Sequence, residues 1–300
     1  MTDQFMKLNA GDAGTIQLGD MTVNRFGFGT MRLPGPGVWG EPADPDNARA
    51  VLRRAIDLGV NLMDTAEYYG PLVANRLIVE ALYPYPSDLV IASKVGGKRG
   101  DDASWHPEVE PEKLKAACEA NLKHLRLERI DLVHFRQFPG NVIPLADSLG
   151  ALVDLQREGK IRHIGISSVT LTELVEAQQT ATIVSVENLY NIAERKYEAE
   201  IDFCTAHKIV FMPYFPLAIG KLSQAQGSLP TVAQTHHATP SQIALAWLLA
   251  RSPIMLPIPG TSSLEHLEEN IAASKITLSV EEYTLLSHWV PAPAQFTSMR

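Results

Sequence analysis

The 300-residue sequence is poor in cysteine and has no dense run of basic residues. Its two cysteines, Cys118 and Cys204, lie far apart, each within a helical pattern, which favours a reducing compartment over a disulfide framework. The net charge is −8, so nucleic acid and anionic membrane surfaces are poor candidates for partners. No apolar run approaches the length of a membrane span.

Two targeting and binding signals are missing as well. Residues 1–7 lack the basic and then apolar pattern of a signal peptide, so we expect a cytoplasmic protein. The glycine-rich turn of a doubly wound dinucleotide-binding fold is incomplete, because Gly27 and Gly29 are not followed by the third glycine of that fingerprint. A Rossmann fold is therefore disfavoured.

What the chain does have is an ordinary globular composition, 45% hydrophobic and 20% charged, and a regular order of elements. The pattern predicts a β-hairpin over 15–23, turned at Gly19 and Asp20, and then eight strands that alternate with amphipathic helices. We expect strands at 26–29, 60–64, 89–94, 130–135, 163–166, 183–186, 209–212 and 254–256. We expect helices at 45–58, 72–83, 145–158, 171–179 and 197–207, and others that begin after Pro111, after Pro240 and near Ser263. This order predicts an α/β fold, a (β/α)8 TIM barrel with an N-terminal β-hairpin, and a single domain over 1–300.

Three residues with acid–base chemistry follow neighbouring strands of this barrel. Asp64 ends the second strand, Tyr69 comes five residues later, and Lys94 ends the third strand. Because barrel enzymes build their active sites at the C-terminal strand ends, we expect these side chains to meet. The carboxylate would orient the ammonium, and the ammonium would lower the pKa of the phenol. Such a phenol can give a proton to a carbonyl oxygen while hydride reaches the carbon.

Each of these residues also has an ordinary structural interpretation. Asp64 is a typical cap for the following helix, Tyr69 a typical core aromatic, and Lys94 a typical solvated strand end. The combination of all three at this spacing, each at an expected strand end, favours the chemical interpretation.

At these residues the chain resembles the aldo-keto reductase superfamily. The resemblance rests on D-T-A-x-x-Y-G over 64–70 and on Lys94, and it extends over nearly the whole chain. It implies a (β/α)8 barrel that binds a nicotinamide dinucleotide and uses a tetrad of Tyr, Lys, Asp and His. It further implies an NAD(P)H-dependent enzyme that reduces a small carbonyl substrate, with Tyr69 as the proton donor.

The resemblance implies a set of residues around the nicotinamide. They are Gly29, Thr30, Met31, Ser167, Ser168, Glu187, Tyr214, Phe215, Pro216 and Leu217. Tyr214 would stack on one face of the ring and leave the other open for hydride transfer, although a core aromatic is the alternative. Ser168 stands where the family has Asn. Glu187 stands where it usually has Gln, and a carboxylate can accept from the carboxamide nitrogen but cannot donate to its oxygen.

The resemblance also implies a segment for the adenosine phosphate. Its residues are Gly260, Thr261, Ser262, His266, Glu269 and Asn270. Gly260 and His266 stand where many relatives have Lys and Arg, so a 2′-phosphate would be held by backbone N–H groups, hydroxyls and a helix N-terminus. We favour NADPH as the cofactor and leave NADH possible. Ser263 is a typical helix cap whatever ligand is bound.

The fourth tetrad member departs from the family. The histidine is expected five residues after Asp131, where this chain has Arg136, and His134 lies two residues earlier on the same strand face. A guanidinium can donate to a developing oxyanion but cannot shuttle protons at neutral pH. Arg136 therefore favours a substrate with an anionic or phenolic group. An ion pair with a nearby carboxylate is the alternative.

The substrate pocket is expected to contain Trp39, Tyr69, Trp105 and Arg136. Arg136 and the segments around Trp39 and Trp105 resemble a bacterial branch of the superfamily that includes pyridoxal reductases. This implies reduction of pyridoxal, whose 3-hydroxyl ionises readily beside the aldehyde. Lys98 and Arg99 are expected in a solvated loop near the same mouth.

The sequence is also compatible with two other functions. Lys94 could form a Schiff base in an aldolase. Alternatively, the chain could be a nucleotide-binding regulatory or redox-sensing subunit with little turnover. No metal is expected. The sequence leaves the oligomeric state and the physiological direction of the reaction undetermined.

Overall fold

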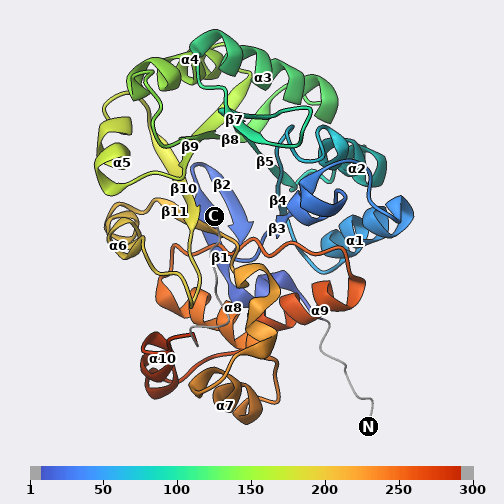
Figure 1. The fold of residues 1–300 in the computed structure, drawn as a ribbon, viewed down its shortest axis with the longest axis vertical. Coiled ribbons are helices and arrows are strands. Elements are labelled where there is room, and N and C mark those ends of the chain that lie inside the picture. The colour runs from blue at the N-terminus through green and yellow to red at the C-terminus, as the bar shows by residue number, and fades with distance from the viewer. Residues whose placement is uncertain (1–7, 292–300) are drawn as a thin grey trace.

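The computed structural model describes residues 8–291, so the pattern expected over residues 1–7 lies outside the described part. Seven parallel strands follow one another around the molecule in chain order, with helices outside them (Figure 1). The strands are β3 (Phe28–Gly29), β4 (Leu62–Asp64), β5 (Val90–Val95), β8 (Ile130–Arg136), β9 (Ile161–Ser167), β10 (Ile183–Leu189) and β11 (Val210–Tyr214). The helices that cover them are α1 (Pro45–Asp57), α2 (Val73–Leu82), α3 (Pro111–Leu125), α4 (Leu145–Arg157), α5 (Leu171–Ala177), α6 (Glu198–His207), α8 (Pro240–Arg251) and α9 (Leu264–Ala272).

The expected eighth strand is a short bridge rather than a full strand. The amide of Phe211 donates to the carbonyl of Ile254 at 2.9 Å, and the amide of Leu256 donates back to Phe211 at 2.9 Å. On the other side, the amide of Gly27 donates to the carbonyl of Pro257 at 3.0 Å. Residues 254–257 therefore connect β11 to the first strand, and the sheet closes into the predicted (β/α)8 barrel.

The predicted hairpin is confirmed, as β1 (Thr15–Leu18) and β2 (Met21–Asn24). Its apolar side chains belong to one buried cluster with inward-facing residues of the barrel strands, namely Leu18, Met21, Val23, Leu62, Val90, Ala92, Leu132, Val210, Met212, Leu256 and Ile258. Side chains alternate along a strand, so the next inward positions are Asp64, Lys94 and Glu187. The barrel interior thus changes from apolar to charged toward the C-terminal strand ends.

The sequence patterns missed several elements outside the barrel. A second hairpin, β6 (Gly97–Arg99) with β7 (Trp105–Pro107), replaces the loop expected after the third strand. Helices α7 (Ser228–Thr235) and α10 (Val280–Ser287) lie beyond the expected units. The third strand ends at Val95, one residue later than expected. Within residues 8–291 no helix is both long and apolar enough to cross a bilayer.

Candidate active site

Asp64 and Lys94 form a buried ion pair at the C-terminal ends of β4 and β5. Lys94 Nζ donates to Asp64 Oδ1 at 2.5 Å and to the carbonyl of Thr65 at 3.3 Å. The two side chains are 4% and 2% exposed. Burial alone would lower the pKa of Lys94, but the carboxylates of Asp64 and Glu187 outweigh it and raise that pKa well above its ordinary value. Lys94 therefore stays an ammonium, and neither the cap nor the solvated-lysine alternative describes this pair.

Tyr69 is 4% exposed, and Lys94 Nζ lies 5.4 Å from the centre of its ring. The expectation of a lowered pKa for this phenol is wrong. Burial raises the pKa of Tyr69 above its ordinary value, and the Lys94 ammonium offsets this only in part because Asp64 already shares its charge. At neutral pH the phenol consequently keeps its proton, which is the form that a proton donor needs.

Glu187 and His134 lie beside this pair. Glu187 Oε2 is 3.3 Å from Lys94 Nζ and 3.3 Å from His134 Nδ1. His134 Nε2 forms a hydrogen bond with Ser185 Oγ at 2.8 Å. Burial, with a smaller contribution from Lys94, lowers the pKa of His134 well below its ordinary value, so the ring is neutral.

Arg136 ends β8 two residues beyond His134, on the same inward face. Among the described residues its guanidinium has no carboxylate within 4.0 Å, and its Nε is buried without a hydrogen-bond partner. The alternative of an ion-paired arginine is therefore not what the described residues show. The guanidinium lies 5.7 Å from the ring of Trp105 and 5.2 Å from that of Phe138. A half-buried cation without an anionic partner is a candidate group for binding an anion.

The β6–β7 hairpin brings Trp105 against Tyr68 near this end of the barrel. Trp105 packs edge-on against Tyr68 with ring centres 5.6 Å apart. Arg99 stacks on Trp105 and Trp39, with its guanidinium carbon 4.1 and 5.3 Å from their ring centres. It also donates to the carbonyl of Val38 at 2.9 Å. The expectation of a solvated Arg99 is wrong, because this side chain ties the hairpin to the segment that carries Trp39.

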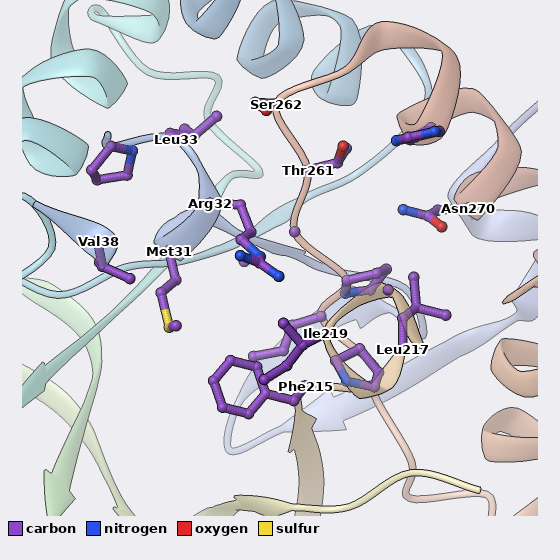
Figure 2. Close-up of a pocket in the computed structure, with 18 of the residues that line it drawn as sticks. Met31, Arg32, Leu33, Val38, Phe215, Leu217, Ile219, Thr261, Ser262 and Asn270 are labelled. Carbon is purple, nitrogen blue, oxygen red and sulfur yellow. The ribbon is translucent and has the colours of Figure 1, made fainter. Parts of the chain in front are cut away.

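A cavity of about 1050 Å³ begins at the acid–base residues. The predicted residues that line it are Gly29, Met31, Asp64, Tyr69, Glu187, Tyr214, Phe215, Pro216, Leu217, Gly260, Thr261, Ser262, His266, Glu269 and Asn270. Figure 2 shows Met31 and Val38 along one wall and Phe215, Leu217 and Ile219 along another, with Thr261, Ser262 and Asn270 at the far end. Tyr214 is half-buried at this cavity rather than in the core.

The other predicted residues are not among those that line the cavity: Thr30, Trp39, Lys94, Trp105, Arg136, Ser167 and Ser168. Thr30 is buried and donates to the carbonyl of Asp64 at 3.0 Å, so it holds β4 in place. Ser168 has a left-handed backbone with φ +62°, and its Oγ is 3.4 Å from the hydroxyl of Tyr214.

The far end of the cavity lies at the N-terminus of α9. Ser263 caps this helix through the amide of His266, and Asn47 of α1 donates to the carbonyl of Ser262 at 2.6 Å. Glycine is required close by, because a Cβ at Gly260 would lie 2.2 Å from the carbonyl oxygen of Gly29. Thr261 Oγ1 accepts from the amide of Ser263 at 3.0 Å, and its hydroxyl hydrogen can still donate. A helix N-terminus with such hydroxyls beside it suits a phosphate group.

Sequence reasoning missed Arg32 and the hydroxyl of Tyr68. The Arg32 side chain extends into the cavity between the walls (Figure 2), and it supplies a cation at a segment expected to have none. Its only sequence signal is a basic residue directly after Met31, at the end of the first strand. Tyr68 Oη is buried without a hydrogen-bond partner near Arg136 and Lys94.

This donor set fits a nicotinamide dinucleotide. The aromatic Tyr214 and the hydroxyls and helix N-terminus at Thr261 line the same cavity, as a dinucleotide with a ring and a phosphate requires. It does not fit a metal ion equally well. Asp64, His134 and Glu187 place possible ligand atoms within 4.8 Å of one another, but the Lys94 ammonium already lies against both carboxylates. The same ion pairing makes Lys94 a poor Schiff-base nucleophile.

Residues 25–289 match the aldo/keto reductase family. The chain belongs to this family. It is therefore an NAD(P)H-dependent oxidoreductase, as expected from Asp64, Tyr69 and Lys94.

Individual relatives agree with this assignment. The chain is 48% identical over 280 residues to the pyridoxine 4-dehydrogenase of Escherichia coli (strain K12), which covers 91% of this chain and 97% of that protein. The crystal structure of a thermostable aldo-keto reductase with an inhibitor is similar with a TM-score of 0.81 and 32% identity, over 91% of this chain and 98% of the other. An aldo-keto reductase from Klebsiella pneumoniae in complex with NADP and acetate has a TM-score of 0.77 and 28% identity, over 91% and 93% of the two chains.

Proposed function

We propose that this aldo/keto reductase uses NADPH to reduce an aldehyde to an alcohol, with pyridoxal to pyridoxine as its preferred reaction and Tyr69 as the proton donor. One arrangement supports this most strongly: the protonated Tyr69 lies at the inner end of the cavity beside the Asp64–Lys94 pair, with Arg136 unpaired nearby. The pyridoxine 4-dehydrogenase relative supports the choice of substrate.

Bound NADPH supplies the hydride, and the chain supplies the proton and the orientation. The Tyr69 hydroxyl gives its proton to the carbonyl oxygen as that oxygen gains negative charge. Lys94, fixed by Asp64, keeps a positive charge near the phenol and stabilises the phenolate that is left.

In this proposal Arg136 recognises the substrate by donating hydrogen bonds to it. A guanidinium donates through several N–H groups in one plane, so it can hold a phenolate and a developing alkoxide on adjacent ring positions. Trp105 and Phe138 bound the space around it with apolar surface, which suits a flat heteroaromatic ring. Pyridoxal offers both an aldehyde and an ionisable hydroxyl on such a ring.

The preference for NADPH over NADH is assigned to the far end of the cavity. Thr261 and Ser262 offer hydroxyls, α9 offers its N-terminus, and Arg32 adds a full positive charge. We expect NADPH to bind at least about tenfold more tightly than NADH, a difference of about 1.4 kcal/mol. The protein is further proposed to act in the cytoplasm as a single domain over 1–300.

A panel of carbonyl compounds, assayed by the loss of NADPH or NADH absorbance, tests the proposal. The panel holds pyridoxal, a benzaldehyde with an ortho hydroxyl, plain benzaldehyde and an aliphatic ketone. We expect pyridoxal with NADPH to give the highest kcat/KM and plain benzaldehyde a much lower one. Saturable NADPH binding without turnover of any member would instead favour the regulatory-subunit alternative.

A further inference from the structure

Two buried polar atoms face each other beneath the cavity without a hydrogen bond. They are Glu187 Oε2 and His134 Nδ1, 3.3 Å apart, on residues that are 2% and 0% exposed. Lys94 Nζ lies 3.3 Å from the same Oε2, but it directs its hydrogen bonds to Asp64 and the carbonyl of Thr65. Because unsatisfied buried polar atoms are costly, this pair requires a shared proton.

The pair can hold that proton in two ways. With Glu187 ionised, His134 Nδ1–H donates to the carboxylate, and His134 Nε2 accepts from the hydroxyl of Ser185. With Glu187 protonated, the carboxyl group donates to Nδ1, and Nε2–H donates to Ser185 Oγ, which is 2.8 Å away. Gly165 leaves room for this contact, because a Cβ there would lie 2.4 Å from Ser185 Oγ. The neutral ring of His134 can thus form a hydrogen bond with Glu187 in both charge states of the carboxyl group.

The groups around Glu187 oppose its ionisation in part. Asp64 on β4 repels a second carboxylate, whereas Lys94 on β5 and Arg136 on β8 attract it. Its neighbours in register on β9 and β11 are Ser167 and Met212, which do not titrate in this range. Burial first, and then Asp64, raises the pKa of Glu187 to about 8. The carboxyl group therefore changes charge close to neutral pH.

Glu187 also lines the cavity, at the same end as Tyr69 and Tyr214. A nicotinamide ring carries one more positive charge in its oxidised form than in its reduced form. A carboxylate in this buried place consequently stabilises the oxidised ring, whereas a neutral carboxyl group does not. The glutamine that the family usually has at this position does not ionise, so its charge cannot change with pH.

We propose that the proton shared by Glu187 and His134 sets the relative affinity for the two forms of the cofactor, so that the protonated site favours NADPH and the ionised site favours NADP⁺. This inference rests on the proposed function, because it takes the cavity as the cofactor site. It makes the balance between carbonyl reduction and alcohol oxidation depend on pH through a group other than Tyr69. The proton that leaves Glu187 when NADP⁺ binds goes to solvent.

The test measures the dissociation constants of NADPH and NADP⁺ by tryptophan fluorescence, from about pH 6.5 to about pH 9.5, in the wild type and in Glu187→Gln. Titration of the 2′-phosphate cancels in the ratio, since both cofactors carry this group. In the wild type we expect the preference for NADP⁺ to rise about tenfold or more over this range. In Glu187→Gln we expect a ratio that does not depend on pH.

A second readout needs no variant. In weakly buffered solution near pH 7.5, NADP⁺ binding to the wild type should release a fraction of a proton, whereas NADPH binding should release less. Equal proton release for both cofactors would overturn the inference. The same pH dependence in Glu187→Gln as in the wild type would also overturn it and would assign the proton to Asp64. If neither cofactor bound, the proposed function itself would fail instead.

Discussion

The two inward-facing layers of the barrel differ in what they contribute. The lower layer, closed by the β1–β2 hairpin, contains a cluster of apolar side chains that includes Leu62 and Leu132. The upper layer, two residues further along the strands, contains Asp64, Lys94 and Glu187, all at most 4% exposed. Both layers are equally buried, so burial alone does not explain the difference.

The two layers contribute differently to the free energy of folding. Burying a leucine side chain stabilises the fold by about 1.5–3 kcal/mol. Burying an ion pair costs free energy of desolvation that the pair often fails to recover, so a hydrophobic replacement is often neutral or stabilising. The upper layer is therefore better explained by chemistry than by stability. Four substitutions separate these roles.

The largest effect is expected from Tyr69→Phe in the upper layer. The substitution removes one hydroxyl and leaves the ring in its buried place, so turnover should fall by about 10²–10⁴-fold while NADPH affinity barely changes. The measurement is kcat for pyridoxal beside a fluorescence titration of NADPH. Tyr68→Phe is the matched control and should lose much less. A larger loss of turnover in Tyr68→Phe than in Tyr69→Phe would show that Tyr68 is the proton donor.

Leu132→Ala in the lower layer should affect stability instead. Leu132 is fully buried under the hairpin, so the cavity left behind should lower the free energy of unfolding by about 2–5 kcal/mol. Denaturant unfolding measures this change. The folded variant should keep near-normal kcat and NADPH affinity, because Leu132 contacts no reacting group. A loss of activity comparable to that of Tyr69→Phe would show that the layers are not separate.

Arg136→Ala tests whether Arg136, at the rim of the upper layer, recognises the substrate. We expect kcat/KM for pyridoxal to fall about a hundredfold, about 2.7 kcal/mol in the transition state. Plain benzaldehyde should lose less, since it offers only the developing alkoxide. The decisive quantity is the ratio of kcat/KM between the two substrates. An unchanged ratio would show that Arg136 does not recognise the hydroxyl.

The last prediction concerns pH and the stability of the cofactor-free protein, with a small effect per pH unit. Glu187 has a pKa of about 8 when folded and an ordinary one near 4.5 when unfolded, so between these values the folded state holds a proton that the unfolded state has lost. The free energy of unfolding should therefore fall as pH rises from about 5 to about 8, by at most about 1.4 kcal/mol per unit from this group.

Glu187→Gln should lack this contribution and show a shallower slope. Urea unfolding of both proteins at several pH values separates the contribution of Glu187 from those of other acids, such as the half-buried Glu67, whose pKa burial raises to about 7. Parallel slopes would mean that Glu187 is already ionised across this range.

The sequence predicted the barrel because its signals are local. Strand ends at Asp64 and helix starts such as Pro45, Pro111 and Pro240 depend on neighbouring residues and were placed within about two positions. The β6–β7 hairpin was missed because a short pair around Arg99 and Trp105 has little apolar alternation. It is held instead by stacking on a distant tryptophan, Trp39.

The site was predicted in outline for the same reason. Motif spacing brought Asp64, Tyr69 and Lys94 together, but the pKa of Tyr69 could not be predicted without knowing its burial. The facing atoms of His134 and Glu187 come from strands that are not adjacent in the sheet. No local sequence pattern therefore predicts the contact between them. Arg32 likewise enters the cavity only through the geometry of the chain after β3.

A single-turnover experiment tests the central claim most directly. The protein is premixed with saturating NADPH and then mixed with pyridoxal, and the loss of NADPH absorbance is followed through the first turnover, with pyridoxine quantified at the end. The account predicts a rapid phase that yields one pyridoxine per NADPH consumed, slowed about a hundredfold or more in Tyr69→Phe. A first turnover of equal rate in both proteins, or NADPH oxidation without pyridoxine, would contradict it.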